Sequence, residues 1–176
     1  RFKVSWIGFW FHIPGQTLDP TQVADDFYNS GYDVVVSGID TTEALVEAGK
    51  MSRAGKPCRA VQYDYRNACG EAPEACLGAP YFNWGPAYRR TVQRVRDGKW
   101  TQFWEWDGPD WSDINNPDTS AIGFVYGPAL APEAASKLDE FVKRLGAGSV
   151  DLLRGPLFFQ DGSVYLKPGE KATSPA

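Results

Sequence analysis

The feature that most constrains the fold is a β-branched run that follows a helix signal. Asp33-Val34-Val35-Val36 is a short, continuous apolar segment, typical of a strand that is buried on both faces of a parallel sheet. Asp19-Pro20 before it has the pattern of a helix start, an N-cap and then a first-turn proline, and Gly31 marks the end of that helix. Residues 4–8 are a further apolar run that ends in glycine. Together these segments predict a β-α-β unit.

The same alternation continues along the chain. Asp40-Thr41-Thr42-Glu43 has the pattern of a capping box, which predicts a helix that runs to about residue 54. Strands are expected at residues 59–62 and 77–82, and Asn83-Trp84-Gly85-Pro86 predicts the start of another helix, which ends at Gly98. Alternating strands and helices indicate an α/β fold with a Rossmann-like, doubly wound and mainly parallel sheet.

The last third of the chain has a different character. Residues 100–111 are aromatic and rich in turn formers, and residues 122–126 are interpreted as an apolar connection that leaves the sheet. Residues 132–145 carry apolar side chains at helical spacing, which predicts a C-terminal helix. Residues 158–166 contain Asp161-Gly162 at their centre and predict a β-hairpin.

Size and composition favour one substantial core. The chain has 176 residues and is 43% apolar, and no apolar run approaches the ~20 residues that span a bilayer. Its 18 basic and 22 acidic residues are balanced, which argues against nucleic acid or an anionic membrane surface as a partner. We expect an α/β lobe over residues 1–130, a helix and hairpin over 131–167, and a disordered tail over 168–176.

Candidate binding residues follow the predicted strands. In open α/β sheets, ligands bind beyond the carboxyl ends of the strands. Aromatic rings there can stack on a flat ligand, while carboxylates and an amide can bind its polar groups, a combination that suits a base, a nucleoside or a sugar. The candidates are Trp10, Phe11, Asp40, Thr41, Asp64, Asn83 and Trp84.

Each candidate also has a purely structural interpretation. Asp40 is well placed to cap the helix that follows it, and Asn83 could cap the next one. Trp10 and Trp84 could be core anchors. Asp64 follows a strand and precedes no obvious helix, which favours a polar contact with a ligand.

The cysteines and the lone histidine bear on chemistry and location. Cys69 and Cys76 bracket a Gly- and Pro-containing loop, where a disulfide is sterically reasonable and would fit an oxidising compartment, although unpaired thiols remain an alternative. His12 has no nearby nucleophile, and we find no zinc-ligand spacing, serine elbow or phosphate-binding loop. We therefore predict no catalytic residue, metal or cofactor. An Asp40 and Asp64 pair leaves a hydrolase open as an alternative.

Several of these segments resemble one protein family. Residues 4–14, 33–48 and 61–64, and especially Phe82-Asn83-Trp84-Gly85-Pro86-Ala87-Tyr88, resemble the basic membrane protein family. These are substrate-binding lipoproteins of ABC importers with the type I periplasmic-binding-protein fold. The resemblance implies that the chain corresponds to the second half of such a protein, without the N-terminal lobe and its lipidated cysteine. Residues 131–167 would then pack on or towards that lobe.

The resemblance also implies a ligand and a location. It implies a purine base or nucleoside, with Trp10 stacked on the base, Asp64 at the ribose hydroxyls and Asp40 in the loop that lines the base pocket. Nucleoside-binding members have a lysine where this sequence has Asn83-Trp84, so a bare base is an equal candidate. We expect an extracytoplasmic protein that performs no catalysis, binds an ABC permease and not nucleic acid, and reaches the membrane only through the lipid anchor. The alternatives are the effector domain of a Lac-repressor-like regulator and a nucleoside or glycoside hydrolase.

Overall fold

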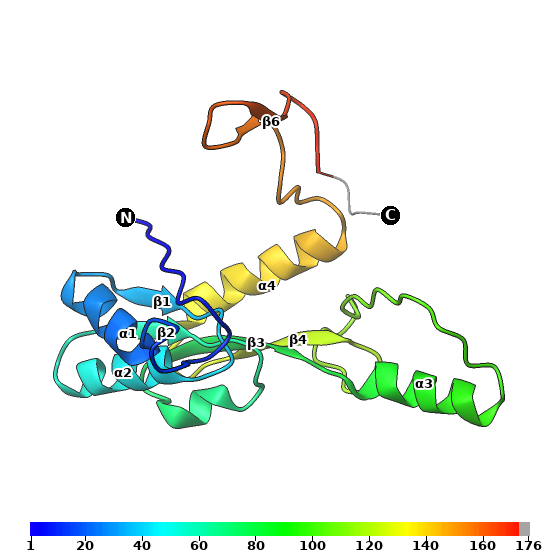
Figure 1. Cartoon of the computed structure of the whole chain (residues 1–176), viewed down its shortest axis with the longest axis horizontal. Coiled ribbons are helices and arrows are strands. Elements are labelled where there is room, and N and C mark those ends of the chain that lie inside the picture. The colour runs from blue at the N-terminus through cyan, green and yellow to red at the C-terminus, as the bar shows by residue number, and fades with distance from the viewer. Residues whose placement is uncertain (173–176) are drawn as a thin grey trace. The chain divides into compact units, whose positions relative to one another are not determined.

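The computed structural model describes residues 1–172 and has a mixed α/β architecture (Figure 1). The chain divides into two compact units, Arg1–Pro132 and Glu133–Ala176. The first unit holds a four-stranded sheet, and the second holds a two-stranded hairpin. Among the described residues, no helix has both the length and the apolar character that are needed to cross a membrane.

Two helices of the first unit begin near the predicted positions. Helix α1 (Pro20–Asn29) starts after Asp19, whose carboxylate accepts a hydrogen bond from the Thr21 amide at 2.8 Å, as an N-cap should. Helix α2 (Glu43–Arg53) packs against α1. The prediction of a helix start at Asp19-Pro20, with Asp19 as the N-cap, is therefore confirmed.

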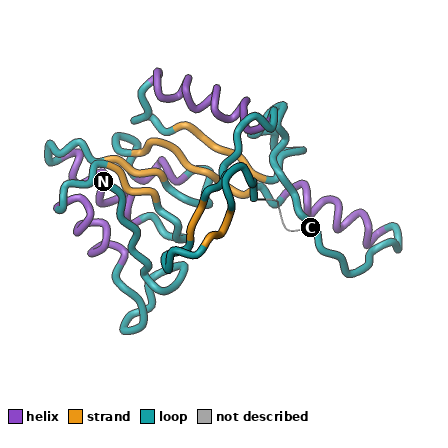
Figure 2. The backbone as a smooth tube through the Cα atoms, turned by 90° about the horizontal axis from the view of Figure 1, so that it is seen from above, coloured by secondary structure: helices purple, strands orange, loops and turns teal. Residues whose placement is uncertain are grey.

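The sheet has the strand order β1-β2-β3-β4. Figure 2 shows the strands in orange. Strands β1 (Val34–Val36), β2 (Arg59–Val61) and β3 (Cys76–Phe82) pair in parallel, which confirms the mainly parallel sheet. Strand β4 (Ile122–Tyr126) pairs antiparallel with β3 along its length, so the prediction that residues 122–126 leave the sheet is wrong. An antiparallel neighbour needs no crossover helix. The backbone of this apolar run supplies hydrogen-bond partners to the edge of β3 that β2 leaves unpaired. Helix α3 (Gly85–Arg96) lies between β3 and β4 in the chain.

Two expectations for the N-terminal strands are also wrong. Among the described strands β1 pairs with β2 alone, and its Val34 and Val36 side chains are exposed, so it is an edge strand and is not buried on both faces. Residues 4–8 form no strand. The carbonyl of Ile7 instead accepts a hydrogen bond from the Leu18 amide at 2.9 Å, because the loop over residues 9–18 folds back on this segment.

The core of the first unit lies where α1, α2, β2 and the start of β3 meet. Tyr28 reaches from α1 and places its hydroxyl 3.0 Å from the Ala44 carbonyl oxygen and 3.2 Å from that of Arg59. Burial raises the pKa of this phenol, and Tyr28 therefore stays a hydrogen-bond donor. The buried cluster is otherwise built mainly of small side chains, which let the helices approach the sheet closely: Ala24, Ala44, Leu45, Ala48, Cys58, Ala60, Ala72, Ala75 and Cys76.

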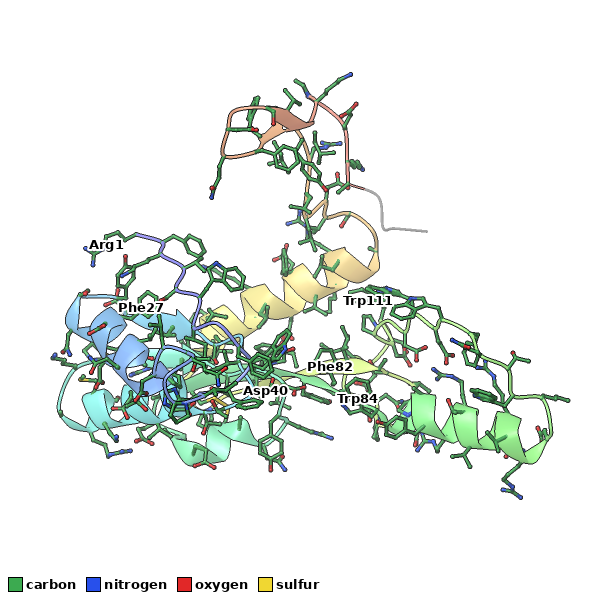
Figure 3. All side chains as sticks on the ribbon, viewed as in Figure 1. Arg1, Phe27, Asp40, Phe82, Trp84 and Trp111 are labelled. Carbon is green, nitrogen blue, oxygen red and sulfur yellow. A yellow bond between two sulfur atoms is a disulfide. The ribbon has the colours of Figure 1, made fainter. Side chains whose placement is uncertain are left out.

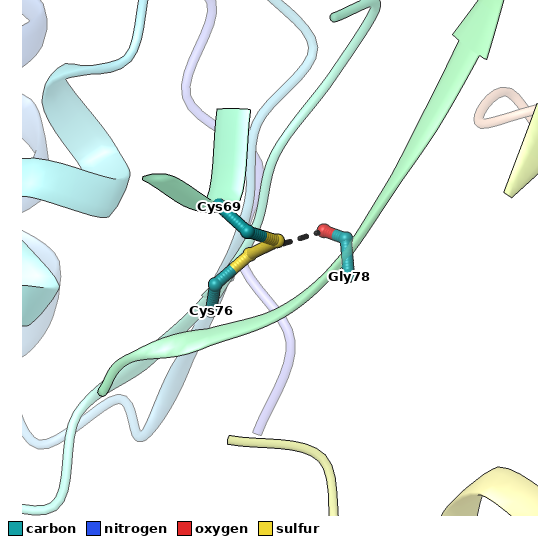
Figure 4. The surroundings of a disulfide bond; sticks show 3 residues. All are labelled: Cys69, Cys76 and Gly78. Atoms are coloured by element: carbon teal, nitrogen blue, oxygen red, sulfur yellow. Dashed lines mark hydrogen bonds between the residues drawn. A yellow bond between two sulfur atoms is a disulfide. The ribbon is translucent and has the colours of Figure 1, made fainter. Parts of the chain in front are cut away.

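A disulfide joins Cys69, in the short 3₁₀ helix η1 (Ala68–Glu71), to Cys76 at the start of β3, with 5.3 Å between the two Cα atoms (Figure 4). Cys58 is a free and buried thiol. Burial raises the pKa of the Cys58 thiol, which keeps it protonated.

The second unit contains helix α4 (Pro132–Gly146) and the hairpin of β5 (Leu157–Phe158) and β6 (Val164–Leu166). Both the helix and the hairpin were expected at these positions. Lys171 forms an isolated antiparallel bridge with Arg154. Residues 173–176, the end of the tail for which disorder is predicted, lie outside the described residues.

Candidate ligand-binding site

Hydrogen bonds join three loops at the carboxyl edge of the parallel strands. The Asp40 amide donates to the Trp10 carbonyl oxygen at 2.8 Å. The Gln62 side-chain amide, which follows β2, donates to the Thr41 carbonyl oxygen at 3.0 Å. The structure thus brings together Trp10, Asp40 and Thr41. The strand-end rule accounts for Asp40 and Thr41, which follow β1, but not for Trp10, because residues 4–8 form no strand.

Asp40 does not cap α2. The N-cap of this helix is Thr42, and it makes no side-chain capping hydrogen bond, so the predicted capping box does not form. The Asp40 side chain is exposed, and no hydrogen bond to its carboxylate is present within residues 1–172. Its carboxylate is therefore free to accept a hydrogen bond from a ligand.

Asp64 occupies a strained turn directly after β2. Its φ angle is 69°, in the left-handed region, and the Tyr65 amide donates to the Tyr63 carbonyl oxygen at 2.9 Å across it. A positive central φ beneath such a two-residue hydrogen bond is typical of the rare form of the γ-turn. Residues held in such regions cost roughly 1–3 kcal/mol and cluster at binding and catalytic sites. The turn fixes the direction in which the Asp64 carboxylate leaves the backbone.

Tyr63 is a site residue that sequence reasoning missed. Its half-buried ring packs edge to face on Phe82, with 6.1 Å between the ring centroids. Burial raises the pKa of the Tyr63 phenol, and the negative charges of Asp64 and Asp40 raise it further. The charges of both candidate carboxylates therefore act on the Tyr63 phenol. The signal in the sequence is its place between the end of the strand predicted over residues 59–62 and Asp64.

A row of aromatic rings continues from Tyr63 along the end of β3. Phe82 and Trp84, which Figure 3 labels, have ring centroids 5.5 Å apart. The Trp84 ring also stacks on that of Tyr88, with 6.2 Å between centroids. Trp84 is 59% exposed and Trp10 is 56% exposed, so neither is a core anchor. Both can present a ring face to a ligand.

Two other candidates have different surroundings. The Asn83 side-chain amide donates to the carbonyl oxygens of Ser120 at 2.7 Å and Pro117 at 3.0 Å, which commits both of its N–H groups to holding the loop before β4. Phe11 is exposed and packs edge to face on Phe9, with 5.0 Å between centroids. In the structure Asn83 is thus a loop anchor, and Phe11 belongs to the aromatic turn that carries Trp10.

A polar hollow adjoins Asp40 at the N-terminus of α2. Its volume is about 510 Å³, which is within the range of small-ligand pockets. Neither Trp10 nor Trp84 lines it. The Thr41 hydroxyl and one Glu43 carboxylate oxygen are buried without hydrogen-bond partners among the described residues. The lining residues are Thr21, Asp40, Thr41, Thr42, Glu43, Val46, Glu47 and Lys50.

Comparison with known proteins gives one informative match. No protein-family model matches the chain. The chain is 28% identical over 175 residues to a protein of Brucella abortus (strain 2308) that is named a purine-binding protein. The alignment covers 98% of this chain but 44% of the Brucella protein, so the chain spans less than half the length of this relative. The relative is named for binding and not for an enzymatic activity.

Proposed function

We propose that this chain binds a purine, as a free base or a nucleoside, at the carboxyl edge of its sheet, and that it performs no chemistry on it. The observation that carries the proposal is the Asp40 carboxylate, which caps no helix, on a backbone that is hydrogen-bonded to that of the exposed Trp10. Similarity to a purine-binding protein over 98% of the chain supports this ligand class.

The chemistry of the edge suits a purine. A purine presents a flat π face and in-plane N–H groups, which need an aromatic platform and hydrogen-bond acceptors respectively. Stacking of a base on a ring such as Trp10 contributes about 1–3 kcal/mol. A hydrogen bond to an ionised carboxylate contributes about 1.5–3 kcal/mol. One ring and one carboxylate are together too weak for micromolar binding. Micromolar affinity therefore requires a second surface that also contacts the ligand.

We further propose that the second surface is another lobe, and that the whole protein is an extracytoplasmic solute-binding component of an ABC importer. The chain spans 44% of its relative, which leaves room for such a lobe, and the Cys69–Cys76 disulfide suits an oxidising compartment. In this proposal the closed protein binds the permease, and a lipid anchor on the other lobe holds it at the membrane.

Calorimetric titration of the chain with adenine, hypoxanthine, their nucleosides, ribose and amino acids tests the ligand class. We expect binding of purines only. Trp10→Ala should weaken it roughly 5- to 150-fold and Asp64→Asn at least about tenfold. Trp104→Ala, at another exposed tryptophan, and Asp33→Asn, at the opposite end of β1, are matched controls and should leave the affinity unchanged. Binding of sugars or amino acids in place of purines would refute the ligand class.

Uptake of a labelled purine tests the role in import. Cells of the source organism in which the gene is deleted should lose high-affinity uptake of the purine that binds best, and the wild-type gene should restore it. A gene carrying Trp10→Ala should restore it poorly, and one carrying Trp104→Ala should restore it fully. Unchanged uptake in the deletion strain would argue against the importer role while leaving purine binding intact.

A further inference from the structure

We infer that Gln62 is a positioning residue for the binding edge: its buried side chain holds the loop that carries Asp40 and, through Asp40, the turn that carries Trp10. This role rests on the proposed function, because it concerns the same site. It adds to the candidate residues one that sets the affinity without touching the ligand.

The loop between β1 and α2 is joined to the end of β2 at two points. The Ser37 amide donates to the Val61 carbonyl oxygen at 2.9 Å, which continues the pairing of β1 with β2. The Gln62 side-chain amide donates to the Thr41 carbonyl oxygen at 3.0 Å. Asp40 lies between these two points in the sequence, directly before Thr41. The Gln62 bond therefore holds the backbone next to the Asp40 carboxylate.

Trp10 is connected to the sheet through Asp40. Residues 4–8 form no strand, so strand pairing does not fix the turn that carries Trp10. The Asp40 amide instead donates to the Trp10 carbonyl oxygen at 2.8 Å. A shift of the Asp40 backbone would therefore move the base of the indole side chain as well. Binding groups need such supporting contacts to keep a productive geometry, and the buried Gln62 donor supplies one for both side chains.

Gln62 is an unfavourable choice for stability alone. Its side chain is 1% exposed, and its Oε1 atom is buried without a hydrogen-bond partner among the described residues. A buried acceptor without a partner costs stability, and an apolar side chain of similar size would avoid that cost. What the glutamine adds is the donor to Thr41. Because Gln62 is too buried to contact a ligand at the edge, this donor acts on binding by holding the loop in place before the ligand arrives.

Calorimetric titration of Gln62→Met with adenine and hypoxanthine tests this role, since methionine keeps the volume of the side chain and removes the donor. We expect the affinity for both bases to fall about 2- to 12-fold and by the same factor, because Gln62 touches neither base. This range is the net contribution of one hydrogen bond, about 0.5–1.5 kcal/mol, converted at about 1.4 kcal/mol per tenfold change.

Tyr28→Phe is the matched control, because it also removes a buried donor to backbone carbonyls in the first unit, away from the binding edge. It should lower the midpoint of unfolding in urea and leave the affinity for both bases unchanged. Gln62→Met should do the reverse: it lowers the affinity, and it lowers the midpoint less than Tyr28→Phe does, because it also removes the unpaired Oε1 atom. A merely structural role would not separate affinity from stability in this way.

Hydrogen exchange measures the positioning directly. In Gln62→Met the Asp40 amide proton should exchange faster relative to that of Ala60, which donates to the Ala75 carbonyl oxygen in the core. Gln62→Asn has a shorter side chain that withdraws the amide from Thr41, so it should show the same changes in affinity and exchange. This second variant keeps the test available if Gln62→Met does not fold.

Unchanged affinity for both bases in these Gln62 variants would overturn the inference and leave the proposed purine function standing. Unequal weakening of adenine and hypoxanthine binding would indicate direct contact with the ligand in place of positioning. Weaker binding without faster exchange at Asp40 would equally contradict the role of the loop. Absence of any purine binding by wild type would remove the proposed function, and this inference with it.

Discussion

The Cys69–Cys76 disulfide should be a large contributor to the stability of the first unit. The two cysteines are 7 positions apart, and closing a loop of that size in the unfolded chain is worth about 2.4 kcal/mol on the chain-entropy relation. Cys76 is fully buried in the core cluster, so the link also fixes where β3 begins. Cys69→Ala removes the link and leaves Cys76 as a small apolar side chain.

Urea unfolding followed by tryptophan fluorescence measures this contribution. All seven tryptophans lie within Arg1–Pro132, so the signal reports on the first unit alone. With a slope of about 2 kcal/mol per molar urea, Cys69→Ala should unfold at about 1 M less urea than the oxidised wild type. A reducing agent should lower the wild-type midpoint by a similar amount and leave that of Cys69→Ala unchanged. A wild-type midpoint that does not respond to reduction would refute the reasoning.

Three further predictions concern single side chains. Tyr28→Phe removes the hydroxyl that donates to the Ala44 and Arg59 carbonyl oxygens and should lower the free energy of unfolding by about 1–3 kcal/mol in the same urea assay. Asp40→Asn should weaken purine binding about tenfold or more by calorimetry yet leave the urea midpoint unchanged, because the carboxylate does not cap α2; a lowered midpoint would restore the capping role. Burial, and the neighbouring Glu47, raise the pKa of Asp25. Since the folded pKa is raised, the Asp25 contribution to stability is fully present below pH 3.8 and is lost as pH rises through the folded pKa. Asp25→Asn should therefore melt higher than wild type at pH 7 and not at pH 3, and equal melting at both would contradict the shift.

Local signals in the sequence were sufficient to predict most of the helices and strands. The Asp19-Pro20 pair and the three-valine run depend only on neighbouring residues, and the structure has a helix and a strand there. The pairing of β4 could not be predicted in this way, because its register with β3 depends on residues some forty positions away in the chain. The missing strand at residues 4–8 has the same cause, since a strand exists only where another strand offers hydrogen bonds to it.

The candidate site was predicted in part for an equally physical reason. Asp40 and Thr41 follow β1, as the strand-end rule requires, whereas Trp10 follows no strand and is held beside them by the Asp40 amide. Asn83 obeys the same rule, yet its amide binds a loop that is distant in sequence, which no local pattern reveals. Tyr63 follows the predicted strand over residues 59–62, but its ring packing on Phe82 depends on a residue about twenty positions away, which no local pattern reveals.

The turn at Asp64 is where the backbone preference of the residue and its observed conformation disagree most. Glycine adopts a φ of 69° without cost, whereas an aspartate there is disfavoured, although less so than most residues. If the turn alone mattered, glycine would serve it better, so the side chain must add something that glycine lacks. Within residues 1–172 the Asp64 carboxylate accepts no hydrogen bond that could repay the strain, while its charge acts on Tyr63. Strain without an internal compensation is expected where the compensation comes from a bound ligand.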